Sequence, residues 1–366
     1  MNSDTQPSPL GHAKGVAKLL ARVAAFLGLL AALWLVWRED PRTVLNLLRV
    51  AGPGLVLAAS VHVVAMLANA CDWRLLVIGP HPPSLAQMLR VVWIRESVNG
   101  LLPVARVGGE VVSFRILRRL GVSAAAAAGS LVVDTQLTLI SQMLFTIASI
   151  GYLLSHSDFG AFRLAANLAW GVVAFTPIVL LFSLVHHASP FERIARLLNR
   201  VAGGHLTALI GHSTGVDLSI GQIWQRRGAV LRFLFVWQPV QCVATAMELY
   251  VALHFLGTSI TIVQAVVFES LIQALSSVAF FVPGALGVQE GGFVLIGGVL
   301  GLDASMCLAL AGARRVRDLL IFIPGLLAWQ HGEAQGELRH PNAASATTTT
   351  APLPSHDGNT DRGAHD

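Results

Sequence analysis

Long apolar segments separated by short polar ones dominate this chain. A helix needs about 20 apolar residues to cross a membrane, and six stretches meet that length, near 18–37, 54–78, 122–154, 163–187, 229–257 and 314–331. Residues 1–13 and 332–366 break the pattern, because they are rich in Ser, Thr, Pro, Gly and His. The pattern predicts an all-α polytopic membrane protein with about six full transmembrane helices and a disordered tail at each end.

Two further regions, 80–121 and 258–313, are too apolar for solvated loops and are interrupted by Pro and Gly. A backbone that is broken at membrane depth is tolerated only where protein or a water-filled cavity covers it. We interpret each region as a re-entrant helical hairpin; a pair of short full spans is the alternative. The hairpin breaks are expected at Pro103, Gly108, Gly109, Pro283, Gly284 and Gly287.

The two broken regions align without a gap at an offset of 180 residues. "SVNGLLPVARVGGEVVSFRILRRLGVSA" starts at Ser97, and "SVAFFVPGALGVQEGGFVLIGGVLGLDA" starts at Ser277. Three predicted spans separate the copies, so they would enter the membrane from opposite faces, which makes an inverted-topology repeat. The same register places Asp134 opposite Arg314, and we expect these two side chains to pair.

The repeat divides the chain into six parts. Repeat unit 1 and repeat unit 2 each consist of a span, a hairpin and a span. The predicted order is a tail (1–13), a first helix with its loop (14–53), unit 1 (54–154), a fourth span with an amphipathic loop (155–228), unit 2 (229–331) and a second tail (332–366).

Composition supports the membrane assignment and excludes other classes. Hydrophobic residues make up 54% of the chain and charged residues 12%, whereas a soluble domain is about 25% charged. The basic residues lie between the spans and not on one surface, so nucleic-acid binding is not expected. They concentrate before residue 23, in 80–120 and in 188–228, which predicts that both termini are cytoplasmic. Cys71, Cys242 and Cys307 have no metal-ligand spacing, and no cofactor is expected.

Charged residues inside apolar segments are the candidates for substrate handling, because a charge costs about 2.5–3.5 kcal/mol at the bilayer centre. Glu110 and Glu290 each follow a proline by seven residues. They could bind a lipid head group, or they could cap the second half-helix of each hairpin. Arg106 suits bidentate phosphate recognition, but it could also be a cytoplasmic anchor. The predicted substrate-binding residues are Arg106, Glu110, Asp134, Glu248, Glu290 and Arg314.

Polar side chains also form stripes at helical spacing on the predicted spans. Asp134, Thr138, Gln142 and Thr146 share one face, and Gln238, Gln241, Thr245 and Glu248 share another. Such stripes could line a path for a head group or form hydrogen bonds between helices. His62 is expected to be a hydrogen-bonded structural residue.

The segments "NGLLPVARVGGE", "RILRRLG", "VPGALGVQEG" and "ARRVRD" resemble the transmembrane flippase domain of lysylphosphatidylglycerol synthases, the MprF-like family. The run "VVDTQLTLISQMLF" is similar in particular to the stand-alone, hopanoid-associated HpnL type. The resemblance implies translocation of a polar-headed or hopanoid-type lipid across the bacterial inner membrane. The chain ends after the last span, without an aminoacyl-transferase domain, so enzymatic activity is not implied.

The sequence therefore favours a lipid flippase or transporter whose partners are membrane lipids. A non-transporting scaffold that holds lipid-biosynthetic enzymes is the alternative. A transporter predicts a cavity lined by the buried charges, whereas a scaffold predicts that the charges pair with one another.

Overall fold

The computed structural model describes residues 41–80, 82–102, 108–155, 207–278 and 287–339. The predicted spans 18–37 and 163–187, both tails, and Pro103, Arg106, Pro283 and Gly284 lie outside the described residues.

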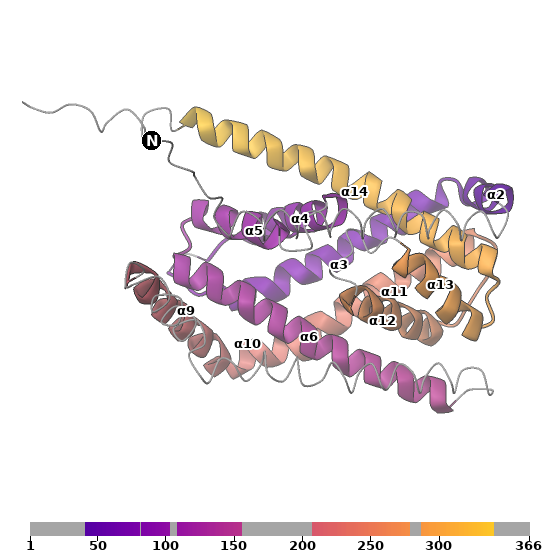
Figure 1. Ribbon diagram of the computed structural model, residues 1–366, viewed down its shortest axis with the longest axis horizontal. Helices are drawn as coiled ribbons and strands as arrows, with labels where there is room; N and C mark the ends of the chain where they lie inside the picture. Colours follow the sequence, from indigo (N-terminus) through magenta and orange to yellow (C-terminus); the bar gives the residue numbers. More distant parts are fainter. Residues whose placement is uncertain (1–40, 81, 103–107, 156–206, 279–286, 340–366) are drawn as a thin grey trace, which may run out of the picture. The chain divides into compact units, whose positions relative to one another are not determined.

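The described part of the chain is helical and contains no strand, which confirms the predicted all-α class (Figure 1). In chain order the elements are α2 (Pro41–Ala51), α3 (Gly54–Leu76), α4 (Leu85–Leu101), α5 (Gly108–Arg119), α6 (Ala124–Ser155), α9 (Thr207–Gln225), α10 (Arg227–Arg232), the π-helical turn η2 (Phe233–Trp237), α11 (Gln238–Phe255), α12 (Ile262–Val278), α13 (Val288–Val299) and α14 (Ala304–Arg339).

Three helices are long and apolar enough to cross a membrane: α3, α6 and the continuous helix Arg227–Phe255. They match the predicted spans 54–78, 122–154 and 229–257. The wide turn η2 inside the third helix directly precedes Pro239, whose ring and missing N–H disturb a regular helical ladder. The protein is therefore a membrane-embedded, multi-pass protein.

Helix α14 contains the predicted span 314–331 but is not among the three span candidates. Its first half carries four charged residues within five positions, Arg314, Arg315, Arg317 and Asp318. Residues 327–366 form a second compact unit, so α14 begins in the first unit and ends in the second.

The two broken regions each contain two short helices. Helices α4 and α12 have 17 residues each, and α5 and α13 have 12 each. At 1.5 Å per residue they span about 25 Å and about 18 Å, less than the ~30 Å of a hydrocarbon core. The re-entrant course of these helices stays a prediction.

A glycine allows the two helices of the first hairpin to approach closely. The Gly109 N–H donates to Asn99 Oδ1 at 2.8 Å. A Cβ atom at Gly109 would lie 2.6 Å from the backbone oxygen of Arg95 on α4. Gly109 is thus needed for packing of α5 against α4, whereas Gly287 caps α13 with a positive φ of 76°.

The structure reproduces the register of the repeat. Helices α5 and α13 have bounds that differ by 180 residues at both ends, and α6 and α14 begin at Ala124 and Ala304. The loops before α6 and α14 contain Gly121 and Gly301 with φ of 88° and 82°, a conformation that favours glycine. Equivalent sequence positions therefore adopt equivalent local structure.

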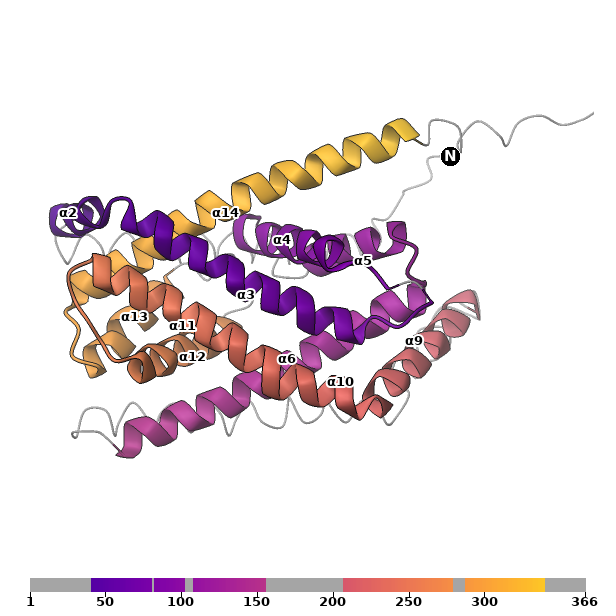
Figure 2. The same cartoon turned by 180° about the vertical axis from the view of Figure 1, so that it is seen from behind.

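Helices α3 and α11, which are equivalent in the repeat, lie side by side and run in opposite directions (Figure 2). Three contacts along their length establish this arrangement. Gly54 meets Phe255, the His62 ring bonds to Glu248, and the Gln238 amide donates to Asp72.

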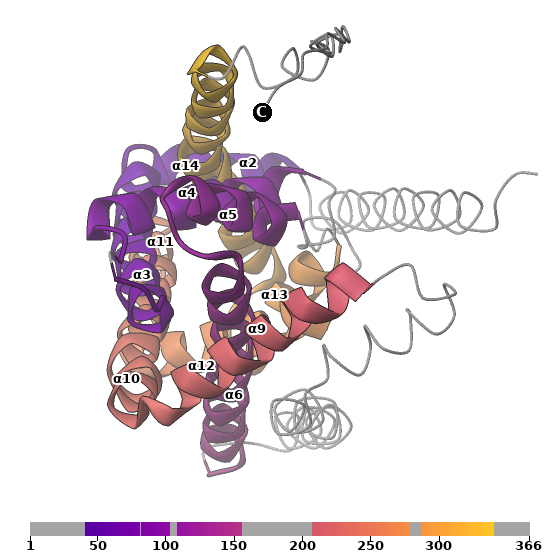
Figure 3. The ribbon, with the colours of Figure 1, turned by 90° about the vertical axis from the view of Figure 1, so that its left-hand side faces the viewer.

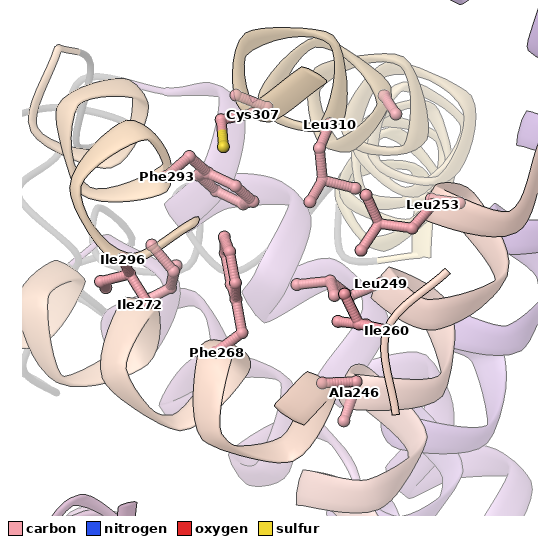
Figure 4. Close-up of a cluster of buried hydrophobic side chains, with 14 of the residues drawn as sticks. Ala246, Leu249, Leu253, Ile260, Phe268, Ile272, Phe293, Ile296, Cys307 and Leu310 are labelled. Atoms are coloured by element: carbon pink, nitrogen blue, oxygen red, sulfur yellow. The ribbon is translucent and has the colours of Figure 1, made fainter. Parts of the chain in front are cut away.

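Each repeat has its own apolar core. The first consists of residues from the C-terminal half of α3, from α4 and from the N-terminal half of α6, and α9 packs against it (Figure 3). The second joins α11, α12, α13 and α14 (Figure 4). In the second core the Phe268 and Phe293 rings lie 5.3 Å apart, and Cys307 packs against Gly297.

Candidate functional site

The buried charges gather in two clusters, one in each repeat. Cluster 1 surrounds Arg95 on α4 and comprises Asn69, Trp73, Arg95, Glu110 and Asp134. Cluster 2 surrounds the first half of α14 and comprises His62, Glu96, Glu248, Glu269, Glu290, Arg314, Arg315, Arg317 and Asp318.

In cluster 1 a single guanidinium connects three other helices to α4. Arg95 Nη1 donates to Asp134 Oδ2 of α6 at 2.7 Å, and Nη2 donates to Asn69 Oδ1 of α3 at 2.9 Å. Its Cζ lies 4.4 Å from the centroid of the Trp73 ring, and Glu110 Oε2 of α5 is 3.9 Å from Nη1. Arginine suits such a site because its planar fork donates in several directions and stacks on aromatic rings.

In cluster 2 three arginines of α14 each bond to a carboxylate of a different helix. Arg314 bonds to Glu269 of α12, Arg315 bonds to Glu290 of α13 through Nη2 at 2.9 Å, and Arg317 bonds to Glu248 of α11 at 2.9 Å. The segment "ARRVRD" therefore ties α14 to the other three helices of repeat unit 2. Removing one partner of a buried pair costs about 3–5 kcal/mol.

His62 connects repeat unit 1 to cluster 2. Its Nδ1 lies 2.9 Å from Glu248 Oε2 and 2.7 Å from Arg317 Nη1, and its Nε2 lies 3.2 Å from Glu96 Oε2. Four helices, α3, α4, α11 and α14, thus meet at one imidazole ring. The expectation that His62 is hydrogen-bonded is confirmed.

The equivalent residues Glu110 and Glu290 have different surroundings. Glu290 Oε2 accepts the Gly287 N–H at 2.7 Å, which caps α13 as the capping alternative predicted, and its other oxygen binds Arg315. Glu110 Oε2 is buried and accepts no hydrogen bond from the described residues. The structure therefore places these carboxylates in separate clusters, and Glu110 is the one with acceptor capacity to spare.

A small cavity opens inside cluster 2. Its volume is about 10 Å³, which is about the space of one water molecule. Its polar lining comes from Glu248, Arg314 and Arg317, and its apolar lining includes Leu55 and Phe293. The charges are thus mostly paired in this conformation, and the space between them is water-sized.

Five of the six predicted substrate-binding residues are described, and all five belong to the clusters. Glu110 and Asp134 lie in cluster 1, and Glu248, Glu290 and Arg314 lie in cluster 2. The predicted pairing of Asp134 with Arg314 is wrong, because each bonds to a charged residue of the hairpin in its own repeat, Arg95 and Glu269 respectively.

Sequence analysis missed the central role of Arg95, which it had counted among the cytoplasmic basic residues. Arg95 is buried, with 8% of its surface exposed. Its position inside the apolar run "VVWIRESV" was the signal that could have identified it. The pairing role of Arg315 was missed as well, because its partner Glu290 lies 25 positions away on another helix.

The comparisons with known proteins agree with this arrangement. No curated protein and no solved structure gives a significant match. The family described as "Lysylphosphatidylglycerol synthase TM region" matches residues 19–325, which include both repeats and both clusters. The chain belongs to the lysylphosphatidylglycerol synthase transmembrane-region family.

Proposed function

We propose that this protein is a lipid flippase or transporter that moves a polar-headed or hopanoid-type lipid between the leaflets of the bacterial cytoplasmic membrane. Family membership supports a function that involves membrane lipids. The observation that carries the proposal is the contact between the two repeats, which is formed in the middle of α3 and α11 by ionisable groups. Ionisable residues inside a membrane protein are expensive and mark transport pathways.

The arrangement suits alternating access, in which two repeats of opposite direction exchange conformations around a central site. The described conformation is the closed one, because the charges of cluster 2 pair with each other and leave a water-sized cavity. Opening would separate the pairs of α14 and free carboxylates and guanidinium groups for a lipid head group. Both termini would lie on the cytoplasmic side.

Glu110 is the residue that best separates a substrate role from a structural one. Its Oε2 has no hydrogen-bond donor among the described residues, and its side chain is 36% exposed. A head group that carries an amine or a hydroxyl would supply the missing donor. Glu290, in contrast, is already engaged by Gly287 and Arg315.

The test is lipid translocation in proteoliposomes that contain NBD-labelled phosphatidylglycerol or an NBD-labelled hopanoid. Dithionite bleaches only the outer leaflet, so translocation appears as additional bleaching. We expect the wild-type protein to translocate at least one probe and Glu110→Gln to lose at least tenfold in rate at unchanged protein level. The matched control is Thr135→Ala, because Thr135 is an exposed residue of α6. A normal rate for Glu110→Gln would refute the substrate role of this carboxylate.

A non-transporting scaffold for lipid-biosynthetic enzymes is the second candidate. The completeness of the pairing in cluster 2 favours it, because a scaffold needs no open cavity. Failure of every lipid probe to move, together with co-purification of a lipid-biosynthetic enzyme, would support the scaffold over the flippase.

A further inference from the structure

The contacts of His62 cannot all be made by one protonation state of its ring. Nδ1 lies close to both a guanidinium (Arg317 Nη1, 2.7 Å) and a carboxylate (Glu248 Oε2, 2.9 Å). A guanidinium only donates hydrogen bonds, and an ionised carboxylate only accepts them. Nδ1 must therefore choose between the two.

A neutral ring with its proton on Nε2 satisfies two of the three contacts. Nε2 then donates to Glu96 Oε2, and the lone pair of Nδ1 accepts from Arg317 Nη1. The other neutral tautomer would leave a bare Nε2 facing the Glu96 carboxylate. The Nε2–H form is thus the neutral state that fits the ionised carboxylates.

A proton added to Nδ1 reverses the preference. The imidazolium donates to Glu248 from Nδ1 and to Glu96 from Nε2. Arg317 Nη1 would then lie 2.7 Å from a second cationic N–H group, and repulsion between like charges at this distance is strong inside a protein. Protonation of His62 therefore requires Arg317 to withdraw from it.

Arg317 has unused hydrogen-bonding capacity beside it. Its buried Nε has no acceptor among the described residues, and the buried Asp318 Oδ1 has no hydrogen bond from them. Nη2 of Arg317 already lies 2.7 Å from that oxygen. A small shift of α14 can convert this ion pair into a hydrogen bond, so withdrawal from His62 does not leave Arg317 without a partner.

The helices around α3 present a defined set of charges to this ring. Glu96 comes from α4, Glu248 from α11, and Arg317 with Asp318 from α14. The charged residue of α6, Asp134, is bonded to Arg95, and η2 carries no titratable side chain. Arg227 and Arg232 of α10 follow Arg226, which bonds to Leu75 near the C-terminal end of α3. Three carboxylates against one guanidinium leave this immediate set with room for one more positive charge.

We propose that His62 is a proton-binding site and that its proton is the coupling ion of lipid translocation. The proton comes from water, adds to the lone pair of Nδ1 and displaces Arg317 Nη1, which loosens α14 from α3. Its release to water on the other side restores the Arg317 contact. The inference rests on the proposed function and adds its energy source.

The first experiment measures translocation of the same NBD-labelled lipids in proteoliposomes with and without an imposed pH gradient. We expect the gradient to change the wild-type rate at least tenfold, and His62→Gln to remove this dependence. His254→Gln is the matched control, because His254 lies on α11 outside the cluster and is exposed. A gradient-independent wild-type rate, or a gradient-dependent rate in His62→Gln, would overturn the proposal while leaving translocation itself established.

The second experiment does not depend on transport. Protein with ¹⁵N-labelled histidine rings is placed in lipid nanodiscs, and the ring signals that disappear in His62→Gln are followed from about pH 5 to about pH 8, where histidine normally changes its charge. We expect a change from the Nε2–H tautomer to the imidazolium, and a displaced transition in Glu96→Gln, which keeps the histidine. A ring that stays neutral throughout would refute the proton site. If no lipid moves in any condition, the proposed function fails for those lipids, and the ring signals still decide whether His62 binds a proton.

Discussion

Asp134 and Arg314 occupy equivalent positions in the two repeats but take part in ion pairs of opposite polarity. Asp134 Oδ2 of α6 accepts from Arg95 Nη1 of α4 at 2.7 Å, and Arg314 of α14 donates to Glu269 of α12. In both repeats the long helix is thereby tied to the first short helix of its own hairpin. The architecture is conserved between the repeats, while the signs of the charges are exchanged.

Asp134→Asn should destabilise the protein by about 3–5 kcal/mol, because it leaves the buried Arg95 without its ionic partner. Thermal unfolding in detergent, followed by intrinsic fluorescence, measures the change. Thr135→Asn is the control, since Thr135 is the exposed neighbour on the same helix. Equal stability of the two variants would contradict a structural role of the Arg95 pair.

Charge reversal should succeed within a repeat and fail between repeats. The double variant Glu269→Arg with Arg314→Glu keeps an ion pair between α12 and α14, and we expect it to recover at least half of the stability that either single change removes. The double variant Asp134→Arg with Arg314→Asp breaks two separate pairs, so its losses should add. Recovery in the second variant would mean that Asp134 and Arg314 contact each other after all.

Glu290 should tolerate glutamine better than alanine. Gln keeps an oxygen that can accept the Gly287 N–H, whereas Ala removes both the cap, worth about 1 kcal/mol, and the hydrogen bonds from Arg315, worth about 1.5–3 kcal/mol. Unfolding of both variants in detergent gives the comparison. Glu110→Gln serves as the reference from the other repeat and should change stability less than Glu290→Gln, because Glu110 lies 3.9 Å from its nearest cation among the described residues. A similar loss at both positions would show that their surroundings are equivalent.

Two adjacent glycines of α13 should respond in opposite ways to alanine. A Cβ atom at Gly297 would lie 2.3 Å from Cys307 Sγ in the second core, whereas a Cβ atom at Gly298 would meet nothing within 4 Å. We expect Gly297→Ala to lower stability by about 1–3 kcal/mol through overpacking and Gly298→Ala to raise it by up to about 1 kcal/mol through helix propensity. Rescue of Gly297→Ala by Cys307→Ala would confirm the contact, and a failed rescue would refute it.

Much of the architecture follows from the sequence because it depends on local pattern. Apolar length located α3, α6 and the helix Arg227–Phe255, since a membrane demands long apolar helices. The repeat offset of 180 residues gave the equivalence of α5 with α13 before any coordinates, because equivalent glycines, Gly121 and Gly301, are needed for equivalent turns.

The partners of the buried charges could not be predicted, because they depend on how helices far apart in the sequence approach one another. The repeat register correctly made Asp134 and Arg314 equivalent, but equivalence under a pseudo-two-fold axis does not imply contact. Arg95 illustrates the same limit: in the sequence it is one basic residue among many, and only its burial against Trp73 and Asp134 distinguishes it.

The sequence by itself thus determined the fold class, the repeat and the set of intramembrane charges, since each is encoded in composition, periodicity or spacing. Only the tertiary structure decided which charges meet. The antiparallel packing of α3 on α11 brings His62 to Glu248, 186 positions away, and α14 adds Arg317 from a further 69 positions along the chain. Contacts over such separations are set by helix packing, and no local pattern in the chain specifies them.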